Sequence, residues 1–364
     1  MLAGDDQLRR ARARRLRWSD RPRNPMSRLL SAAPRRRPAT RRRVAAALAL
    51  ALLAWLAPAA AHAADALRLA ASRGPVSLPL YVAQRRGFFA DEGLEVTLAD
   101  CIGGTRCLRQ VLDDKADVAT TSEMPVVLQA FAHADVAILA TMVHASDNLK
   151  LIARKASGVT RSEQLGGHRI GVIAGTAAQY LLETHLLNVG VDPQHVTMVP
   201  LQAEETVEAL RGGRIDAVAV WEPYGYAALH GAEAVGLRLP LSGGYIENYN
   251  LVGRRGLFAR RGEAFVRLLR AVERAEQFIQ DDPAAAQAIL REQLGLDQRF
   301  VDWVWGGLAF RLSLDQSLLS TMEGEVRWAQ REGHVAEGAR PNVLTLVHSA
   351  PLKAVKPSAV GIGG

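Results

Sequence analysis

Hydrophobic positions beyond residue 64 follow two alternating patterns. Short apolar runs are separated by longer stretches in which apolar positions recur every three or four residues. The first pattern predicts strands and the second predicts helices, and their alternation is typical of an α/β fold with largely parallel strands. The elements expected in the first part of the chain are strands at 67–71, 94–99 and 117–121 and helices at 78–89 and 103–113.

The same succession of elements returns about a hundred residues later. In both places the second strand begins 27 residues after the first. We therefore predict that one βαβαβ unit is used twice, as two lobes. Ligands of open α/β sheets bind beyond the carboxyl ends of the strands, so two such lobes facing each other predict a ligand between them. The repeated elements are strands at 169–174, 196–201 and 216–220 and helices at 177–187 and 204–210.

The first 63 residues have the features of an export signal. Residues 1–43 contain fifteen Arg and no Lys, the apolar run 44–57 follows, and Ala61-His62-Ala63 forms an Ala-x-Ala box. This order is that of a secretory signal peptide, and the run is shorter than the roughly 20 residues that span a bilayer. We predict removal of residues 1–63 and a soluble periplasmic protein, not a lipoprotein because no Cys stands at the cleavage point. Met26 is an alternative start, and the choice between the Sec and twin-arginine routes stays open.

Removing the signal reverses the charge balance. The whole chain carries 45 basic and 37 acidic side chains, a net charge of +8. Residues 1–63 hold 15 of the basic and 3 of the acidic groups, which leaves 30 and 34, a net charge of −4. Because the positive charge belongs to the signal, we expect no nucleic-acid partner. The roughly 300 residues that remain suffice for two compact lobes.

Two strand-to-helix turns combine glycine with threonine, at Gly103-Gly104-Thr105 and at Gly175-Thr176. Glycine lets the backbone approach a ligand closely, and a helix N-terminus offers unpaired N–H groups to an anion. The threonine hydroxyls of both turns could add donors to the same site. Alternatively, each threonine only caps its own helix.

Polar and aromatic side chains at the ends of predicted strands complete the candidate site. Trp221 could form an apolar wall or pack under Pro223. Glu123 and Glu222 would suit an amine or a ring N–H, or could pair with an Arg at the hinge. The candidate ligand-binding residues are Ser72, Ser77, Gly104, Thr105, Ser122, Glu123, Gly175, Thr176, Trp221 and Glu222.

The sequence has no recognisable catalytic or metal-binding motif. Its nine His residues are scattered without metal-ligand spacing. It contains no Gly-x-Ser-x-Gly, P-loop or dinucleotide fingerprint. We therefore expect no metal, no cofactor and no catalytic residue.

Four segments, in order, resemble one family of binding proteins. They are Ser77–Leu94, with Gly87-Phe88-Phe89 before Glu92-Gly93-Leu94; Leu165–Val172; Gly175-Thr176; and Asp216-Ala217 with Trp221-Glu222-Pro223. The chain is similar here to periplasmic solute-binding proteins of ABC importers for nitrate, sulfonates, taurine and thiamine pyrimidine precursors. The resemblance extends over about residues 66–345.

The resemblance implies a type II periplasmic binding protein with a cleft between two lobes. Lobe 1 would comprise residues 64–155 and 248–349 and lobe 2 residues 156–247, with chain crossings near 153–157 and 246–251. The tail 350–364 contains two Pro and three Gly residues, so we expect it to be loosely attached. Helices with a 3.6-residue period would complete lobe 1 at 263–280, 283–294, 298–308 and 316–330.

The implied function is capture of a small polar or anionic solute and its delivery, as a monomer, to an ABC permease in the inner membrane. The alternatives are an enzyme on the same fold, of desulfinase or pyrimidine-precursor type, or a periplasmic ligand sensor. Cys101 and Cys107 are the two cysteines of the chain, and the oxidising periplasm favours a disulfide between them. Inert thiols, or a nucleophilic Cys107 beside Arg106 at a helix N-terminus, remain the other interpretations.

Overall fold

The computed structural model describes residues 64–232, 234–241, 244–335 and 340–362. The predicted export signal, residues 1–63, lies outside the described residues. No helix within the described ranges combines the length and the apolar character needed to cross a membrane.

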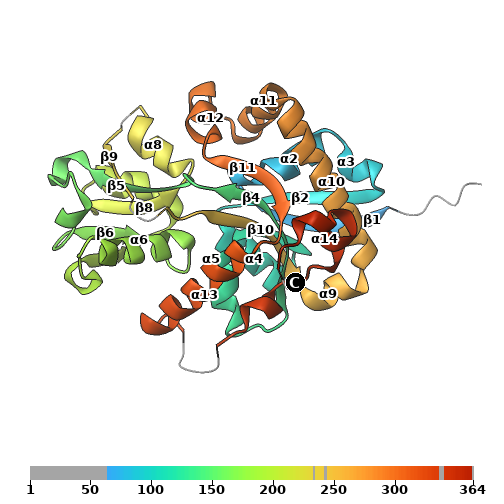
Figure 1. Cartoon of the computed structure of the whole chain (residues 1–364). Coiled ribbons are helices and arrows are strands. Elements are labelled where there is room, and N and C mark those ends of the chain that lie inside the picture. The colour runs from blue at the N-terminus through green and yellow to red at the C-terminus, as the bar shows by residue number, and fades with distance from the viewer. Residues whose placement is uncertain (1–63, 233, 242–243, 336–339, 363–364) are drawn as a thin grey trace, which may run out of the picture. The chain divides into compact units, whose positions relative to one another are not determined.

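Two separate β-sheets, each flanked by helices, organise the chain (Figure 1). In the first sheet β1 runs parallel to its neighbours β2 and β3, while β10 runs antiparallel to both β3 and β4. The strands of this sheet, in spatial order, are β11 (Leu308–Ser313), β4 (Val136–Ala145), β10 (Glu247–Arg254), β3 (Val118–Ser122), β1 (Asp65–Ser72) and β2 (Leu94–Cys101).

The second sheet repeats this arrangement with fewer strands. β6 runs parallel to both β7 and β8, while β5 runs antiparallel to β8 and β9. The order is β7 (Thr197–Pro200), β6 (Arg169–Val172), β8 (Ala217–Trp221), β5 (Leu149–Arg154) and β9 (Gly236–Leu239). The series β2-β1-β3-β10 therefore corresponds to β7-β6-β8-β5, which confirms the repeated βαβαβ unit and the two-lobed α/β fold.

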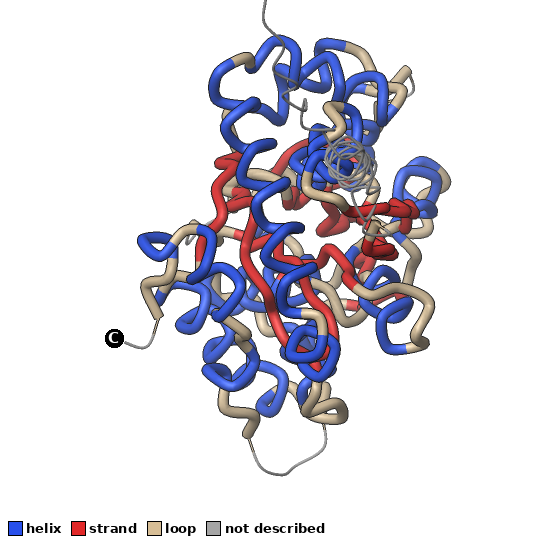
Figure 2. The backbone as a smooth tube through the Cα atoms, turned by 90° about the vertical axis from the view of Figure 1, so that its right-hand side faces the viewer, coloured by secondary structure: helices blue, strands red, loops and turns tan. Residues whose placement is uncertain are grey.

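Helices cover both sheets, and the strands lie inside this shell (Figure 2). Those of the repeated units are α2 (Leu78–Arg85), α3 (Phe88–Asp91), α4 (Gly104–Leu112), α5 (Glu123–Ala130), α6 (Ala177–Asn188), α7 (Thr206–Arg211) and α8 (Tyr224–His230). Those of the C-terminal half are α9 (Arg255–Arg260), α10 (Gly262–Asp281), α11 (Pro283–Leu294), α12 (Gln298–Trp305), α13 (Gln316–Arg331) and α14 (Ala350–Val355).

The C-terminal segment differs from the expected loose tail. Pro351 lies at the start of α14, a position where proline suits a helix. The side chain of Leu352 is fully buried in the core of the first lobe, and Val360 forms a bridge with Leu314. Apolar contacts therefore fix residues 350–362 to the first lobe.

The first chain crossing also lies earlier than expected. β5, at Leu149–Arg154, pairs with β8 and β9 of the second sheet, so the chain leaves the first sheet between Ala145 and Leu149. It returns between Leu239 and Glu247. β4 and β5 are both buried and apolar along most of their length, so the hydrophobic pattern alone does not separate them.

Candidate ligand-binding cleft

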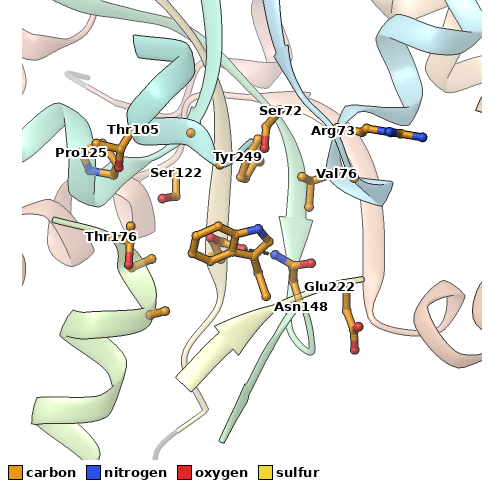
Figure 3. A pocket seen from close by; sticks show the side chains of 17 residues that line it. Ser72, Arg73, Val76, Thr105, Ser122, Pro125, Asn148, Thr176, Glu222 and Tyr249 are labelled. Carbon is orange, nitrogen blue, oxygen red and sulfur yellow. Dashed lines mark hydrogen bonds between the residues drawn. The ribbon is translucent and has the colours of Figure 1, made fainter. Parts of the chain in front are cut away.

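A small cavity lies where residues of both lobes meet (Figure 3). Its volume is about 20 Å³, room for little more than one water-sized group. The residues that line it are Ser72, Arg73, Gly74, Val76, Gly103, Gly104, Thr105, Ser122, Pro125, Asn148, Thr176, Ala177, Ala178, Trp221, Glu222, Glu247 and Tyr249.

The first lobe contributes the turn between β2 and α4. Gly103 has φ +76°, a conformation that glycine adopts without steric cost. A Cβ atom on Gly104 would lie 2.3 Å from Thr121 Oγ1, so the packing of α4 on β3 requires glycine there. Thr105 Oγ1 donates to the carbonyl oxygen of Gly175 at 3.0 Å. This hydrogen bond joins the two lobes directly.

The second lobe contributes the N-terminus of α6. Thr176 Oγ1 donates to Ile173 O at 2.7 Å and accepts from Gln179 N at 3.4 Å, so Thr176 caps α6. Gly175 does not line the cavity, although its carbonyl accepts the bond from Thr105. The cavity is lined beyond Thr176 by Ala177 and Ala178, which lie in the first helical turn, where backbone N–H groups have no partner within the helix.

Trp221, at the end of β8, separates this cavity from a larger one. A Cβ atom on Gly103 would lie 2.9 Å from Trp221 Cζ2, so the indole packs on the backbone of the opposite lobe. The second cavity has a volume of about 250 Å³, shares Thr105 and Trp221 with the first, and is also lined by Arg106 and Arg109. Trp221 is therefore placed as a wall of both cavities, and its contact with a ligand remains a prediction.

Glu222 lines the cavity, but its carboxylate already has partners. It is buried, and its oxygens accept from Trp303 Nε1 at 2.6 Å and from the backbone N of Tyr226 at 2.7 Å. Lys150 Nζ lies 3.3 Å away and is itself fully buried. Burial raises the pKa of Glu222, and the Lys150 ammonium opposes that shift. In Figure 3 the Glu222 side chain lies apart from the group formed by Thr105, Ser122 and Pro125.

Glu123 does not line the cavity; it is buried at the hinge. Its carboxylate accepts from Tyr245 Oη at 2.9 Å and from Asn248 N at 3.0 Å. Burial, together with the neighbouring Glu247 carboxylate, raises the pKa of Glu123 to about 8. The sequence-based alternative that Glu123 pairs with an Arg is wrong, because its hydrogen-bond partners among the described residues are Tyr245 and Asn248.

The two serines after β1 have different positions. Ser72 lines the cavity, whereas Ser77 is fully buried and lies outside the lining. Ser77 Oγ donates to Ser72 O at 2.7 Å and lies 3.2 Å from Thr120 Oγ1. Ser77 thus stabilises the turn after β1, and its expected place at the cavity is wrong. Ser122 lies at the cavity, at the N-cap of α5.

Asn148, Glu247 and Tyr249 line the cavity but were not among the predicted site residues. Asn148 Nδ2 donates to Glu247 Oε2 at 2.7 Å, and both residues are more than nine-tenths buried. Burial raises the pKa of Glu247 to about 7. Asn148 lies in the first chain crossing, directly before β5, and Glu247 is the first residue of β10. The hydrophobic pattern did not resolve either strand. The sequence signal that could have indicated them is the run of polar residues 247–250, which directly precedes the apolar residues Leu251 and Val252.

Cys101 and Cys107 form a disulfide in the structure. The bridge joins the end of β2 to the first turns of α4 and encloses the Gly103-Gly104 turn. A sulfur atom in a disulfide is not a free nucleophile, so this arrangement does not support a catalytic Cys107.

The two sheets, the repeated unit and the cleft between them define the class: the chain has the periplasmic binding protein fold. A family model described as NMT1/THI5 like matches residues 74–286, more than half of the chain, and the chain belongs to this family.

Comparisons with known proteins find sulfonate-binding proteins in particular. The alkanesulfonate-binding protein SsuA from Xanthomonas axonopodis pv. citri, solved with bound MOPS, is 17% identical with a TM-score of 0.70, over 79% of this chain and 99% of that one. A Bacillus subtilis (strain 168) protein named for binding aliphatic sulfonates is 29% identical over 153 residues, which are 40% of this chain and 45% of that protein. The chain thus spans about half the length of that curated relative.

An enzyme shares the fold. The desulfurization enzyme DszB is 17% identical with a TM-score of 0.59, over 81% of this chain and 99% of that one. At such identities the likeness concerns the fold alone, and the role of the cleft has to be argued from its own residues.

Proposed function

We propose that the protein is the periplasmic substrate-binding component of an ABC importer and captures a small sulfonate-like anion between its lobes. One observation carries this proposal: the starts of α4 and α6, from opposite lobes, line both the inner cavity of about 20 Å³ and the adjoining cavity of about 250 Å³, so an anion too large for the inner cavity still meets both helix starts. Each turn offers backbone N–H groups and the positive end of a helix dipole. An anion held by both turns favours the closed arrangement of the lobes.

Further support comes from the predicted export signal, from the family, and from relatives named for binding sulfonates. We propose that the closed protein, as a monomer, delivers its ligand to a membrane permease through the exposed faces of both lobes. The pairing of Cys101 with Cys107 speaks against the enzyme alternative, because a sulfur atom in a disulfide is not a free nucleophile. Residues such as Gly104, Thr105, Ser122 and Trp221 would contact the ligand.

Calorimetry with short alkanesulfonates tests the binding function. We expect saturable one-to-one binding, together with a rise in the melting temperature, because a ligand that binds only the folded protein stabilises it. Sulfate and a carboxylate of the same chain length serve as matched anions. If no sulfonate binds to the mature protein, residues 64–364, the proposed function is wrong.

A further inference from the structure

A forked polar contact made by Arg106 crosses from the first lobe to the second. Arg106, in the first turn of α4, donates from Nη1 to Glu204 Oε1 at 2.6 Å and from Nη2 to Gln202 Oε1 at 2.6 Å. Nη2 also donates to Glu204 Oε2 at 3.3 Å. The Arg106 and Glu204 side chains keep 43% and 38% of their surface exposed, so water and salt reach this contact. We call these three residues the latch.

The latch lies on the solvent side of the two cavities. Its three residues line the cavity of about 250 Å³, here called the outer cavity, and do not line the inner cavity of about 20 Å³. Asn148, in the first chain crossing, and Glu247, at the start of β10, line the inner cavity instead. The order from solvent to hinge is therefore the latch, the outer cavity and the inner cavity.

On both flanks of the cleft the lobes meet through buried groups. Trp328 of α13 donates to Glu183 of α6, and both residues are more than nine-tenths buried. Met124 of α5 is fully buried and belongs to the core of the second lobe. On the opposite flank, Trp303 Nε1 of α12 donates to the buried carboxylate of Glu222 at 2.6 Å. Helices α5, α12 and α13 of the first lobe thus pack on the second lobe.

The flanks and the latch differ in the free energy needed to separate them. Parting a flank exposes apolar surface, and the cost grows with the area exposed. An exposed ion pair contributes little to stability, and salt screens it further. Beside the latch, the lobes are joined by the bond from Thr105 to Gly175 and by the contact of Trp221 with Gly103. The lobes therefore separate most easily on the side of the latch.

We propose that the ligand-free cleft opens at the latch while both flanks stay packed, so that solutes enter through the outer cavity and the latch determines how often the cleft is open. This inference rests on the proposed binding function and adds regulation to the same cleft. Arginine suits such a contact because its planar guanidinium reaches two acceptors at once, which the point charge of lysine does not reproduce.

A thiol inside the inner cavity would report each opening. Ala178 lines that cavity and is 1% exposed, and the cavity has room for a sulfur atom but not for N-ethylmaleimide. Labelling of ligand-free mature Ala178→Cys protein therefore requires an open cleft, and intact mass measures its rate. Cys101 and Cys107 are bridged, so the parent protein should gain no label. Ser122→Cys, at the same cavity, replaces Ala178→Cys if a melting curve shows that the latter is unfolded.

Loss of the latch should speed this labelling. With Ala178→Cys as the background, we expect Arg106→Gln and Glu204→Gln each to raise the labelling rate about two- to fivefold, the effect of an exposed ion pair on an opening equilibrium. High salt should raise the rate of the background protein by a similar factor and change little in Arg106→Gln. The charge reversal Arg106→Glu with Glu204→Arg should return the rate toward that of the background protein.

Two controls locate the effect at the latch. Arg311 is an exposed arginine whose ion pair with Asp315 lies within the first lobe, so Arg311→Gln should leave the labelling rate unchanged. A Met124→Cys thiol reports on the flank between α5 and the second lobe. Its labelling should be no faster in Arg106→Gln, because the flank stays packed when the latch opens.

The outcomes separate the latch from the binding function. Equal labelling rates with and without Arg106→Gln and Glu204→Gln overturn the latch, as does acceleration by Arg311→Gln. Faster labelling of the Met124→Cys thiol in Arg106→Gln means that the flank parts too, which overturns opening at the latch alone. These rates are measured without ligand, so the binding function is untouched by them. Excess ethanesulfonate or propanesulfonate should slow labelling of the background protein. If neither does, the proposed function is wrong while the latch stands on the ligand-free rates.

Discussion

At the scale of single residues, hydrogen bonds within the protein determine which groups remain for a ligand. Thr105 and Thr176 begin corresponding helices, yet their hydroxyls have different partners. Thr176 Oγ1 donates to Ile173 O inside its own lobe, whereas Thr105 Oγ1 donates to Gly175 O of the other lobe. The first bond stabilises a helix start, and the second stabilises the contact between lobes.

Replacement of each threonine by valine should separate these roles. We expect Thr176→Val to lower the free energy of unfolding by about 1 kcal/mol, the cost of a lost helix cap, with little change in ligand affinity. Thr105→Val should leave stability nearly unchanged and weaken binding several-fold, because it removes a bond made only by closed lobes. Urea titrations and calorimetry measure the two effects. A large loss of affinity in Thr176→Val would mean that its hydroxyl contacts the ligand.

The sequence predicted where the turns of the site lie better than it predicted which groups their side chains bond to. Gly104 and Thr105 were found because glycine followed by threonine, between a strand and a helix, is typical of a tight turn that begins a helix. Ser77 and Glu123 were misplaced because a polar residue after a strand can point to the cavity or bond to other groups of the protein, as Ser77 does to Ser72 O and Glu123 to Tyr245. Asn148 lies between two apolar strands, where the local pattern gives no reason to expect a ligand contact.

At the scale of elements, the hydrophobic period predicted the helices of the C-terminal half closely. α11 has the predicted bounds, α10 extends one residue beyond them at each end, α13 extends one residue beyond them at its C-terminal end, and α12 ends at Trp305, three residues before the predicted end. The antiparallel strands β5, β9, β10 and β11 were missed because they enter their sheets from distant parts of the chain. The local sequence does not show which distant strand each of them pairs with. The chain crossings beside these strands were therefore misplaced too.

The connection from β2 to α4 is the element with the most specific construction. The disulfide has a sequence separation of 6 and encloses Gly103, whose backbone touches Trp221 of the other lobe. We expect the double variant Cys101→Ala, Cys107→Ala to lose about 2 kcal/mol of stability, the value for closing so short a loop. Its ligand affinity should also fall, because the turn that presents α4 becomes less ordered. Guanidinium titrations and calorimetry measure both.

The control for that experiment is the intact mass of the mature protein, measured after alkylation with and without prior reduction. We expect no added label without reductant and two labels after reduction. Alkylation of both thiols in unreduced protein purified from the periplasm would contradict the disulfide and reopen a chemical role for Cys107.

At the scale of the whole molecule, a group of buried acids joins the two lobes. Glu123 begins α5, Glu325 lies in α13, Tyr245 lies in the return crossing, and Glu247 begins β10. Tyr245 Oη donates to Glu123 at 2.9 Å and lies 3.5 Å from Glu325 Oε1. α13 continues from here into the second lobe, where Trp328 Nε1 donates to Glu183 of α6 at 3.1 Å. The hinge is thus packed around carboxyl groups that lack a cation among their described partners.

These acids make stability depend on pH. Burial raises the pKa of Glu123 to about 8, that of Glu247 to about 7 and that of Glu325 well above its ordinary value, compared with about 4.3 in an unfolded chain. Near neutral pH the folded protein therefore binds more protons than the unfolded chain, so the free energy of unfolding falls as pH rises. We expect a lower urea midpoint at pH 8.5 than at pH 7. Histidines with lowered pKa, such as His144, affect stability mainly below about pH 6.5, outside this window.

Variants of α13 test whether the pH dependence of stability comes from the acids at the hinge. Glu325→Gln removes a buried acid whose Oε2 has no hydrogen-bond partner, so it should raise the midpoint at pH 8.5 and reduce the difference between the two pH values. Glu323→Gln, an exposed change on the same helix, should leave that difference unchanged. If midpoints of the parent protein rise between pH 7 and 8.5, the hinge acids are ionised in the folded state.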